Sequence, residues 1–104
     1  MADISTLEEG IMASENGADL VSTTMSGYTP YSPQSDKPDV FLATSLTKAV
    51  QVPVIAEGKI HTPQQAVQMF STGVHAIVIG GAITRPLEIA RRFFDAVSAS
   101  QPSA

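Results

Sequence analysis

Glu57 is the residue of this sequence with the clearest potential for chemistry. It ends the apolar run Val52 to Ala56, so its carboxylate would close a buried strand, where it is partly removed from water. A carboxylate in that setting suits general acid/base catalysis. The structural alternative is an ion pair with Lys59, two residues further along the chain.

Glycine-containing turns could hold an anion. Gly58 and the Gly80-Gly81 pair each follow an apolar run, and glycine lets the backbone approach a ligand closely. The amides of such a turn, leading into a helix that begins near Pro86, could bind phosphate, and Arg85 could add a bidentate guanidinium contact. The alternative is that the paired glycines simply form a tight turn between a strand and a helix.

Other polar residues give weaker signals. Asp3 could hydrogen-bond the hydroxyl groups of a ligand or orient a neighbour, with turn capping as an equal alternative. The segment Ser26 to Thr29 supplies hydroxyls, although turn formation explains it as well. His61 and His75 are not accompanied by further ligand residues, so the sequence predicts no metal site and no cofactor.

Four short apolar runs would position these residues. Their apolar residues are consecutive rather than alternating, as in Ala76 to Ile79, which is typical of parallel strands covered on both faces. Each run therefore predicts a buried strand: Met1 to Ser5, Asp19 to Thr24, Val52 to Glu57 and His75 to Gly80.

Segments with helix signals separate the predicted strands. The segment Thr6 to Asn16 opens with a capping residue and an acidic first turn, and Gly17 is placed to stop it. Thr62 caps another helix, which has Pro63 at its first position and ends by Gly73. Two more helices are predicted, from Val40 to Val50 and from Pro86 through Phe94.

Strand, connection and helix thus recur four times, and parallel strands need crossovers of this length, so we predict a parallel α/β sheet. The long connection from Ser26 to Asp39 predicts a functional or disordered loop. Four units do not close a barrel and would leave two open edges. We therefore interpret residues 1–104 as one domain, part of a longer α/β barrel, with its site at the carboxyl ends of the strands.

The composition limits the function classes. With 43% hydrophobic and 15% charged residues the chain should fold, and no apolar run approaches the roughly 20 residues that span a bilayer. A net charge of -4 argues against binding to nucleic acid or to a membrane surface. The absence of cysteine excludes disulfides and thiolate chemistry, and the N-terminus lacks the pattern of a secretory signal, so we expect a cytoplasmic location.

Four blocks of the sequence resemble the bacterial N-acetylmannosamine-6-phosphate 2-epimerase family, in that family's order and at its spacing. They span nearly the whole chain: Met1 to Thr6, Thr23 to Thr29, Ile55 to Ile60 and Gly80 to Pro86. The resemblance implies the C-terminal half, strands five to eight, of a ribulose-phosphate-binding TIM (β/α)8 barrel.

The resemblance also implies a reaction of sialic-acid catabolism, in which an N-acylglucosamine-6-phosphate 2-epimerase interconverts N-acetylmannosamine 6-phosphate and N-acetylglucosamine 6-phosphate. A proton leaves C2 and one returns on the opposite face, which requires two acid/base groups. By resemblance Glu57 is one of them, and the other is a lysine of an early strand, outside this sequence. The residues expected to bind the substrate are Asp3, near the sugar, Gly58, Gly80, Gly81 and Arg85, at the phosphate, and Lys59, on the same side as Glu57.

The expected partners are a phosphorylated N-acetylhexosamine and, at the open edges, either the complementary half-barrel or a second copy of the chain. Because one acid/base group is missing, the isolated chain is expected to be inactive. Two alternatives stay open. One is a non-catalytic phosphosugar-binding module in which Glu57 is dispensable, and the other is a different phosphosugar isomerase on the same barrel.

Overall fold

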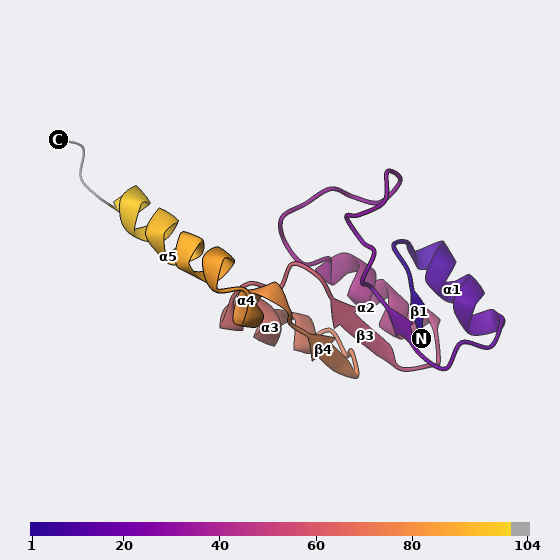
Figure 1. Ribbon diagram of the computed structural model, residues 1–104. Coiled ribbons are helices and arrows are strands. Elements are labelled where there is room, and N and C mark those ends of the chain that lie inside the picture. Colours follow the sequence, from indigo (N-terminus) through magenta and orange to yellow (C-terminus); the bar gives the residue numbers. More distant parts are fainter. Residues whose placement is uncertain (101–104) are drawn as a thin grey trace.

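The computed structural model describes residues 1–100 and contains one sheet of four parallel strands, in the order β1-β2-β3-β4 (Figure 1). The predicted parallel sheet is therefore confirmed. The strands are β1 (Ala2–Asp3), β2 (Val21–Ser22), β3 (Val54–Glu57) and β4 (Ala76–Val78). Residues 101–104 of the predicted domain lie outside the described part of the chain.

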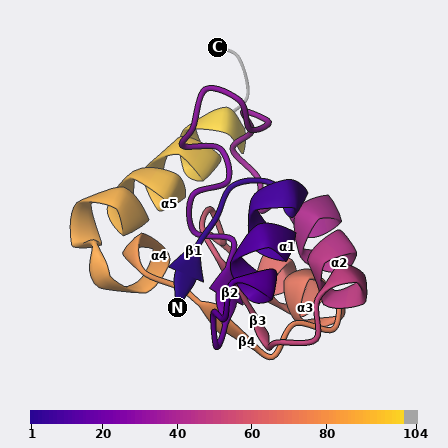
Figure 2. The same ribbon diagram turned by 90° about the vertical axis from the view of Figure 1, so that its right-hand side faces the viewer.

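Three helices lie on one side of this sheet: α1 (Leu7–Glu15), α2 (Val40–Ala49) and α3 (Pro63–Phe70) (Figure 2). Two more follow β4, a single turn α4 (Gly81–Thr84) and the longer α5 (Pro86–Ser100). Helices α1, α2, α3 and α5 were predicted from the sequence. Helix α4 was not, because four residues are too few to show a helical pattern.

The helix caps follow the local sequence signals. In α1, the Thr6 hydroxyl accepts a hydrogen bond from the Glu9 amide while the Glu9 carboxylate accepts one from the Thr6 amide. Thr62 and Gln65 form the same reciprocal pair at the start of α3. Such capping boxes satisfy amides that have no partner inside the helix, so both helix starts are determined locally.

The hydrophobic core lies between the sheet and helices α1, α2 and α3. Alternate strand residues face it, including Val21 of β2 and Val54 and Ala56 of β3. From the helix side it is filled by Leu46 and Met69, which are 0% and 2% exposed. Because side chains alternate along a strand, the residues next to these core positions, such as Ser22 after Val21 and Glu57 after Ala56, face the other side of the sheet.

The outer strands differ from the prediction that every strand is buried. Ala2 and Ile77 are half-buried, Asp3 is exposed, and Val78 is 41% exposed. The prediction is wrong for β1 and β4 because each pairs with a neighbour on one side, whereas β2 and β3 pair on both. Consecutive apolar residues indicate a strand whose two faces are both covered by other parts of the protein. Among the described residues, such cover is complete only for the inner strands β2 and β3.

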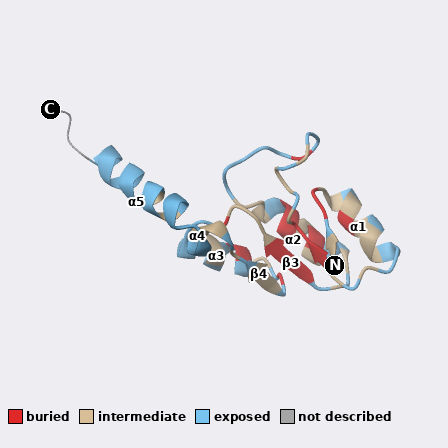
Figure 3. Cartoon of the chain, viewed as in Figure 1, coloured by how far each residue is buried: buried red, intermediate tan, exposed pale blue. Residues whose placement is uncertain are grey.

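Helix α5 extends away from the sheet and contains no buried residue (Figures 1 and 3). It is the main reason for the elongated shape, 58 Å in the longest direction. One residue of α5 contacts α4: the Arg92 guanidinium donates a hydrogen bond to the Ala82 carbonyl at 3.2 Å. Among residues 1–100, none of the helices combines the length and apolarity needed to cross a membrane.

Candidate active site

Glu57 ends β3, and the two threonines that follow β2 hold it in place. The buried Thr23 hydroxyl lies 3.1 Å from both the amide nitrogen and the carbonyl oxygen of Glu57, accepting from the first and donating to the second. The Thr24 hydroxyl lies 2.7 Å from Oε2 of the Glu57 carboxylate. Both the main chain and the side chain of Glu57 are thus held from the neighbouring strand.

Asp3 reaches the same hydroxyl from the opposite side. It ends β1, and its Oδ1 lies 3.2 Å from Thr24 Oγ1. The fully buried Ser22 hydroxyl contacts Thr24 Oγ1 at 2.6 Å. The ends of three adjacent parallel strands therefore carry one polar cluster, and it lies on the face of the sheet turned away from the helices.

A cavity of about 350 Å³ connects β3 with the turn after β4. Of the seven candidate residues, all but Asp3 line it: Glu57, Gly58, Lys59, Gly80, Gly81 and Arg85. The structure thus brings the carboxylate and the glycine turn to one rim. Asp3 does not line the cavity itself, and its contact with this rim is the one with the Thr24 hydroxyl.

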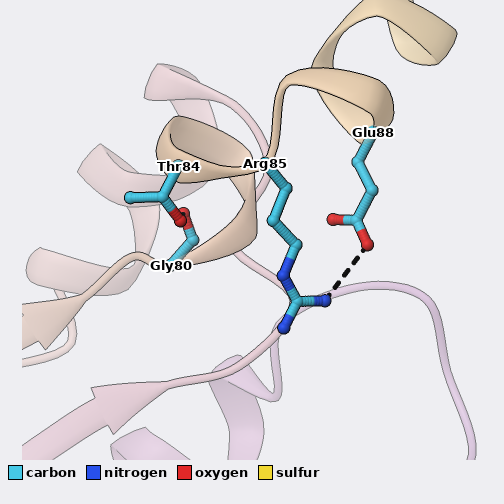
Figure 4. Close-up of polar contacts among 4 residues, drawn as sticks. All are labelled: Gly80, Thr84, Arg85 and Glu88. Carbon is cyan, nitrogen blue, oxygen red and sulfur yellow. Dashed lines mark hydrogen bonds and ion pairs between the residues drawn. The ribbon is translucent and has the colours of Figure 1, made fainter.

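The turn after β4 contains a helical turn that the sequence did not predict, before the helix that starts at Pro86 as predicted. Helix α4 begins at Gly81, with Gly80 as its N-cap, and the amides of Ile83 and Thr84 donate to the Gly80 carbonyl. The Thr84 hydroxyl donates to the same oxygen at 3.1 Å (Figure 4). The glycine pair therefore starts a helical turn immediately, and the amides at the beginning of that turn have no partner within it.

Arg85 stands between α4 and α5 and forms an ion pair with Glu88, with 3.2 Å from Nη1 to Oε1 (Figure 4). The two side chains are 70% and 48% exposed, so the pair is accessible to solvent. Exposed pairs contribute little to stability, which leaves the guanidinium available for exchange with another anion. The Glu88 carboxylate also fills the space beside Gly81, where a Cβ would come within 2.6 Å of it.

Lys59 does not pair with Glu57, which removes the predicted structural alternative for that carboxylate. Its ammonium donates to the carbonyl of Ser35 and lies 5.0 Å from the centroid of the Tyr28 ring, a cation–π arrangement. Its backbone is left-handed, with φ 61°, directly after Gly58 with φ 108°. Lys59 thus ties the end of β3 to the long loop.

The long loop between β2 and α2 is fixed by side-chain contacts. The Ser26 hydroxyl donates to Asp39, the Thr29 hydroxyl to Ser5, and the Tyr31 hydroxyl to Glu9. A second cavity, of about 380 Å³, lies between this loop and the residues that follow Glu57. Of the two predictions for this loop, functional or disordered, its ordering by these contacts and its place beside Glu57 favour the first.

The hydroxyls that follow β2 belong to the site although the sequence predicts no role for either residue. Thr23 and Thr24 lie in one of the blocks that carry the resemblance. Two consecutive polar residues at the end of a buried run are the signal that could have identified them. Within residues 1–100, no three or more His, Asp or Glu side chains are grouped so that they could hold a metal ion.

Comparison with known proteins gives a consistent result. The family model described as "Putative N-acetylmannosamine-6-phosphate epimerase" matches residues 1–99. Relatives named "Putative N-acetylmannosamine-6-phosphate 2-epimerase" include one from Caldanaerobacter subterraneus subsp. tengcongensis, 58% identical and covering 89% of this chain and 39% of the relative. Another, from Clostridium perfringens, is 56% identical and covers 91% of this chain and 43% of the relative.

A solved structure, of the N-acetylmannosamine-6-phosphate 2-epimerase from Clostridium perfringens, is 55% identical with a TM-score of 0.89 and covers 92% of this chain and 42% of that chain. The predicted fold, parallel β/α units that form part of a (β/α)8 barrel, is confirmed by this match. The chain spans about two fifths of the length of the curated relatives it matches.

Proposed function

The chain belongs to the N-acetylmannosamine-6-phosphate epimerase family, and on this premise we propose that residues 1–104 form a partial barrel domain that supplies part of the active site of an N-acylglucosamine-6-phosphate 2-epimerase. The reaction interconverts N-acetylmannosamine 6-phosphate and N-acetylglucosamine 6-phosphate. The bond from C2 to its hydrogen breaks and re-forms on the opposite face of the carbon, so an acid/base group is needed on each side.

Glu57 is the acid/base group that this chain contributes. In one direction its carboxylate takes the proton from C2, and in the other its carboxylic acid returns a proton to the same face. Its placement at the rim of a cavity, with its main chain held by Thr23, suits this role, because proton transfer requires the donor and acceptor to be positioned within hydrogen-bond reach. The single observation that carries the proposal is that Glu57, Gly80 and Gly81 line one cavity.

The phosphate of the substrate binds at the turn after β4. The amides at the start of α4 have no partners in the helix, and the barrel fold uses the N-terminus of a short extra helix after its last strands for this purpose. Arg85 contributes a charged contact by exchanging Glu88 for the phosphate oxygens. Gly58 leaves room for the ligand on the other side of the cavity.

Asp3 and Lys59 have supporting roles in this proposal. The carboxylates of Asp3 and Glu57 both contact the Thr24 hydroxyl, so Asp3 lies close to Glu57. Its proposed role is to accept a hydrogen bond from the sugar. Lys59 lines the cavity together with Tyr28 and contacts both Tyr28 and the Ser35 carbonyl of the long loop. The second acid/base group comes from the complementary half of the barrel, which also covers the outer edges of β1 and β4.

The test is a hybrid barrel in which residues 1–99 of this chain replace the matching part of the Clostridium perfringens epimerase. We expect the hybrid to interconvert the two phosphosugars. Glu57→Gln should lower kcat by about a thousandfold or more, because the amide cannot exchange a proton with C2. Glu15→Gln, at the exposed C-terminal end of α1, is the matched control and should leave kcat unchanged.

Full turnover by the Glu57→Gln hybrid, with unchanged substrate binding, would contradict the catalytic role. It would favour the non-catalytic phosphosugar-binding alternative, in which the turn after β4 is functional and Glu57 is dispensable.

A further inference from the structure

A single hydroxyl lies between the two acidic side chains of the site. Thr24 Oγ1 is 2.7 Å from Oε2 of Glu57 and 3.2 Å from Oδ1 of Asp3. A hydroxyl has one proton to donate, so it can bond one carboxylate at a time. The shorter distance identifies Glu57 as the partner in this structure.

The direction of this hydrogen bond follows from the residue beneath it. Ser22 is fully buried, and its hydroxyl contacts Thr24 Oγ1 at 2.6 Å, its one side-chain partner among the described residues. If Thr24 donated to Ser22, the buried Ser22 proton would have no acceptor and Glu57 would lose its donor. The arrangement that satisfies every group therefore runs from Ser22 to Thr24 and from Thr24 to the carboxylate.

The position of Thr24 follows from the sheet register. Ser22 of β2 pairs with Ile55 of β3, so Thr24, two residues on, is level with Glu57, and both side chains point to the face opposite the helices. The neighbouring Thr23 points to the helix side and bonds the main chain of Glu57. Two consecutive threonines thus hold the backbone and the carboxylate of one residue.

We propose that Thr24 is a positioning residue for Glu57. Its hydroxyl, oriented by Ser22, holds the carboxylate at the angle from which it reaches the substrate carbon, and Asp3 competes for the same proton. This inference rests on the proposed function, because positioning has a kinetic effect only if Glu57 transfers a proton. The cost of losing the hydroxyl is therefore expected in kcat rather than in KM.

The experiment compares Thr24→Val with Thr24→Ser in the hybrid barrel defined above. Valine keeps the shape and removes the hydroxyl, whereas serine keeps the hydroxyl. We expect Thr24→Val to lower kcat by about tenfold or more with KM within about twofold, and Thr24→Ser to retain most of the activity. Thr44→Val is the matched control, since it removes a hydroxyl that bonds the Val40 carbonyl within α2 and should change neither constant.

A second measurement reports the hydrogen bond itself and also shows whether each variant is folded. In protein labelled with ¹³C at the glutamate carboxyl carbons, the Glu57 signal should move in Thr24→Val and stay in place in Thr24→Ser and Thr44→Val. The Glu57→Gln variant identifies that signal by its disappearance.

The outcomes separate the two proposals. If Glu57→Gln abolishes turnover while Thr24→Val leaves kcat and the carboxyl signal unchanged, the positioning role is overturned and the proposed function stands. If Glu57→Gln keeps full turnover, the proposed function fails and the positioning role fails with it. A loss of activity in Thr24→Val that Thr24→Ser shares would also overturn the inference, because the hydroxyl would then not be the group that matters.

Discussion

At the scale of single residues, the partners of two charged side chains determine what each side chain does. Arg85 is held by Glu88, and Glu9 receives hydrogen bonds from Ser5, Thr6 and Tyr31. The first arrangement is exposed and exchangeable, and the second ties α1 to the long loop. They lead to different predictions, one about ligand binding and one about stability.

Replacing Arg85 should weaken phosphate binding. In the hybrid barrel we expect Arg85→Ala to raise KM by about tenfold, with a smaller effect on kcat, because in the proposed site the guanidinium contacts the phosphate, which does not react. Arg91→Ala removes an exposed arginine of α5 and is the control. An unchanged KM in Arg85→Ala would show that the phosphate does not exchange with Glu88.

Glu9 should make the stability of the chain depend on pH in the acid range. The Ser5 hydroxyl, then the Ser5 amide, hold the pKa of Glu9 below its ordinary value of 4.5. The lowered pKa means that this stabilisation is fully present above about pH 4.5 and is lost as the pH falls through the lower, folded-state value.

The measurement is urea unfolding at about pH 6 and about pH 3. Glu9→Gln should be less stable than the parent at the higher pH, and the difference should shrink at the lower pH. Glu8→Gln changes an exposed carboxylate in the same turn and is the control. An equal difference at both pH values would contradict the prediction.

At the scale of elements, the contact between α1 and α2 depends on a glycine in the middle of a helix. Gly10 is buried, and a Cβ at this position would come within 2.3 Å of Cδ2 of Leu46. Leu46 is fully buried, so its side chain has no free space into which to move. The glycine therefore lets the two helices approach, at the cost of helix propensity.

Gly10→Ala should destabilise the chain although alanine favours helix. The gain in propensity is about 1 kcal/mol, whereas forcing a methyl group into a packed contact costs about 1–3 kcal/mol, so we expect a net loss of about 1 kcal/mol. Urea unfolding of Gly10→Ala, Leu46→Ala and the double variant measures this. The two costs should be less than additive, because the shortened residue 46 makes room for the new methyl. Full additivity would show that the residues do not share the contact.

At the scale of the whole molecule, the described residues contain a site that is open on one side. The candidate residues lie at the carboxyl ends of β1, β3 and β4. Helices α1, α2 and α3 cover one face of the sheet (Figure 2), whereas α5 extends away from the sheet (Figure 1). The outer edges of β1 and β4 and an exposed apolar stripe on α5 are open as well. The stripe consists of Leu87, Ala90, Phe94 and Val97, at helical spacing.

The isolated chain of 104 residues should have no measurable epimerase activity. In the proposed mechanism Glu57 exchanges a proton on one face of C2, and Lys59, which follows the same strand end, lies on the same side. A turnover assay on the isolated chain, with the hybrid barrel as positive control, tests this. A rate comparable to that of the hybrid would contradict it.

The isolated chain should also associate with itself, through its open strand edges and the stripe on α5. Light scattering should give a mass above that of the monomer. Phe94→Asp places a charge in the stripe and should reduce the association, whereas Ala96→Asp places the same charge on the other face of α5 and should have less effect. A stable monomer for the parent chain would contradict the prediction.

The sequence by itself determined the order and type of the main elements and the position of the candidate residues at strand ends. These features depend on interactions between residues that are close in the sequence. Thr6 and Thr62 each cap the helix that follows by accepting a hydrogen bond from one of its free amides. A short run of consecutive apolar residues indicates a buried strand without any knowledge of its neighbours in the sheet. Glu57 at the end of such a run could therefore be selected without coordinates. The resemblance to the family could likewise be identified from four short blocks of sequence.

The tertiary structure alone decided which of these residues meet. The register of β2 against β3 places the Thr24 hydroxyl between two carboxylates that are 54 positions apart in the sequence, and the path of the long loop brings Ser35 and Tyr28 to Lys59. The exposure of Val78 and of α5 likewise depends on what packs against them. Contacts between distant segments are determined by register and packing, which no local pattern of residues contains.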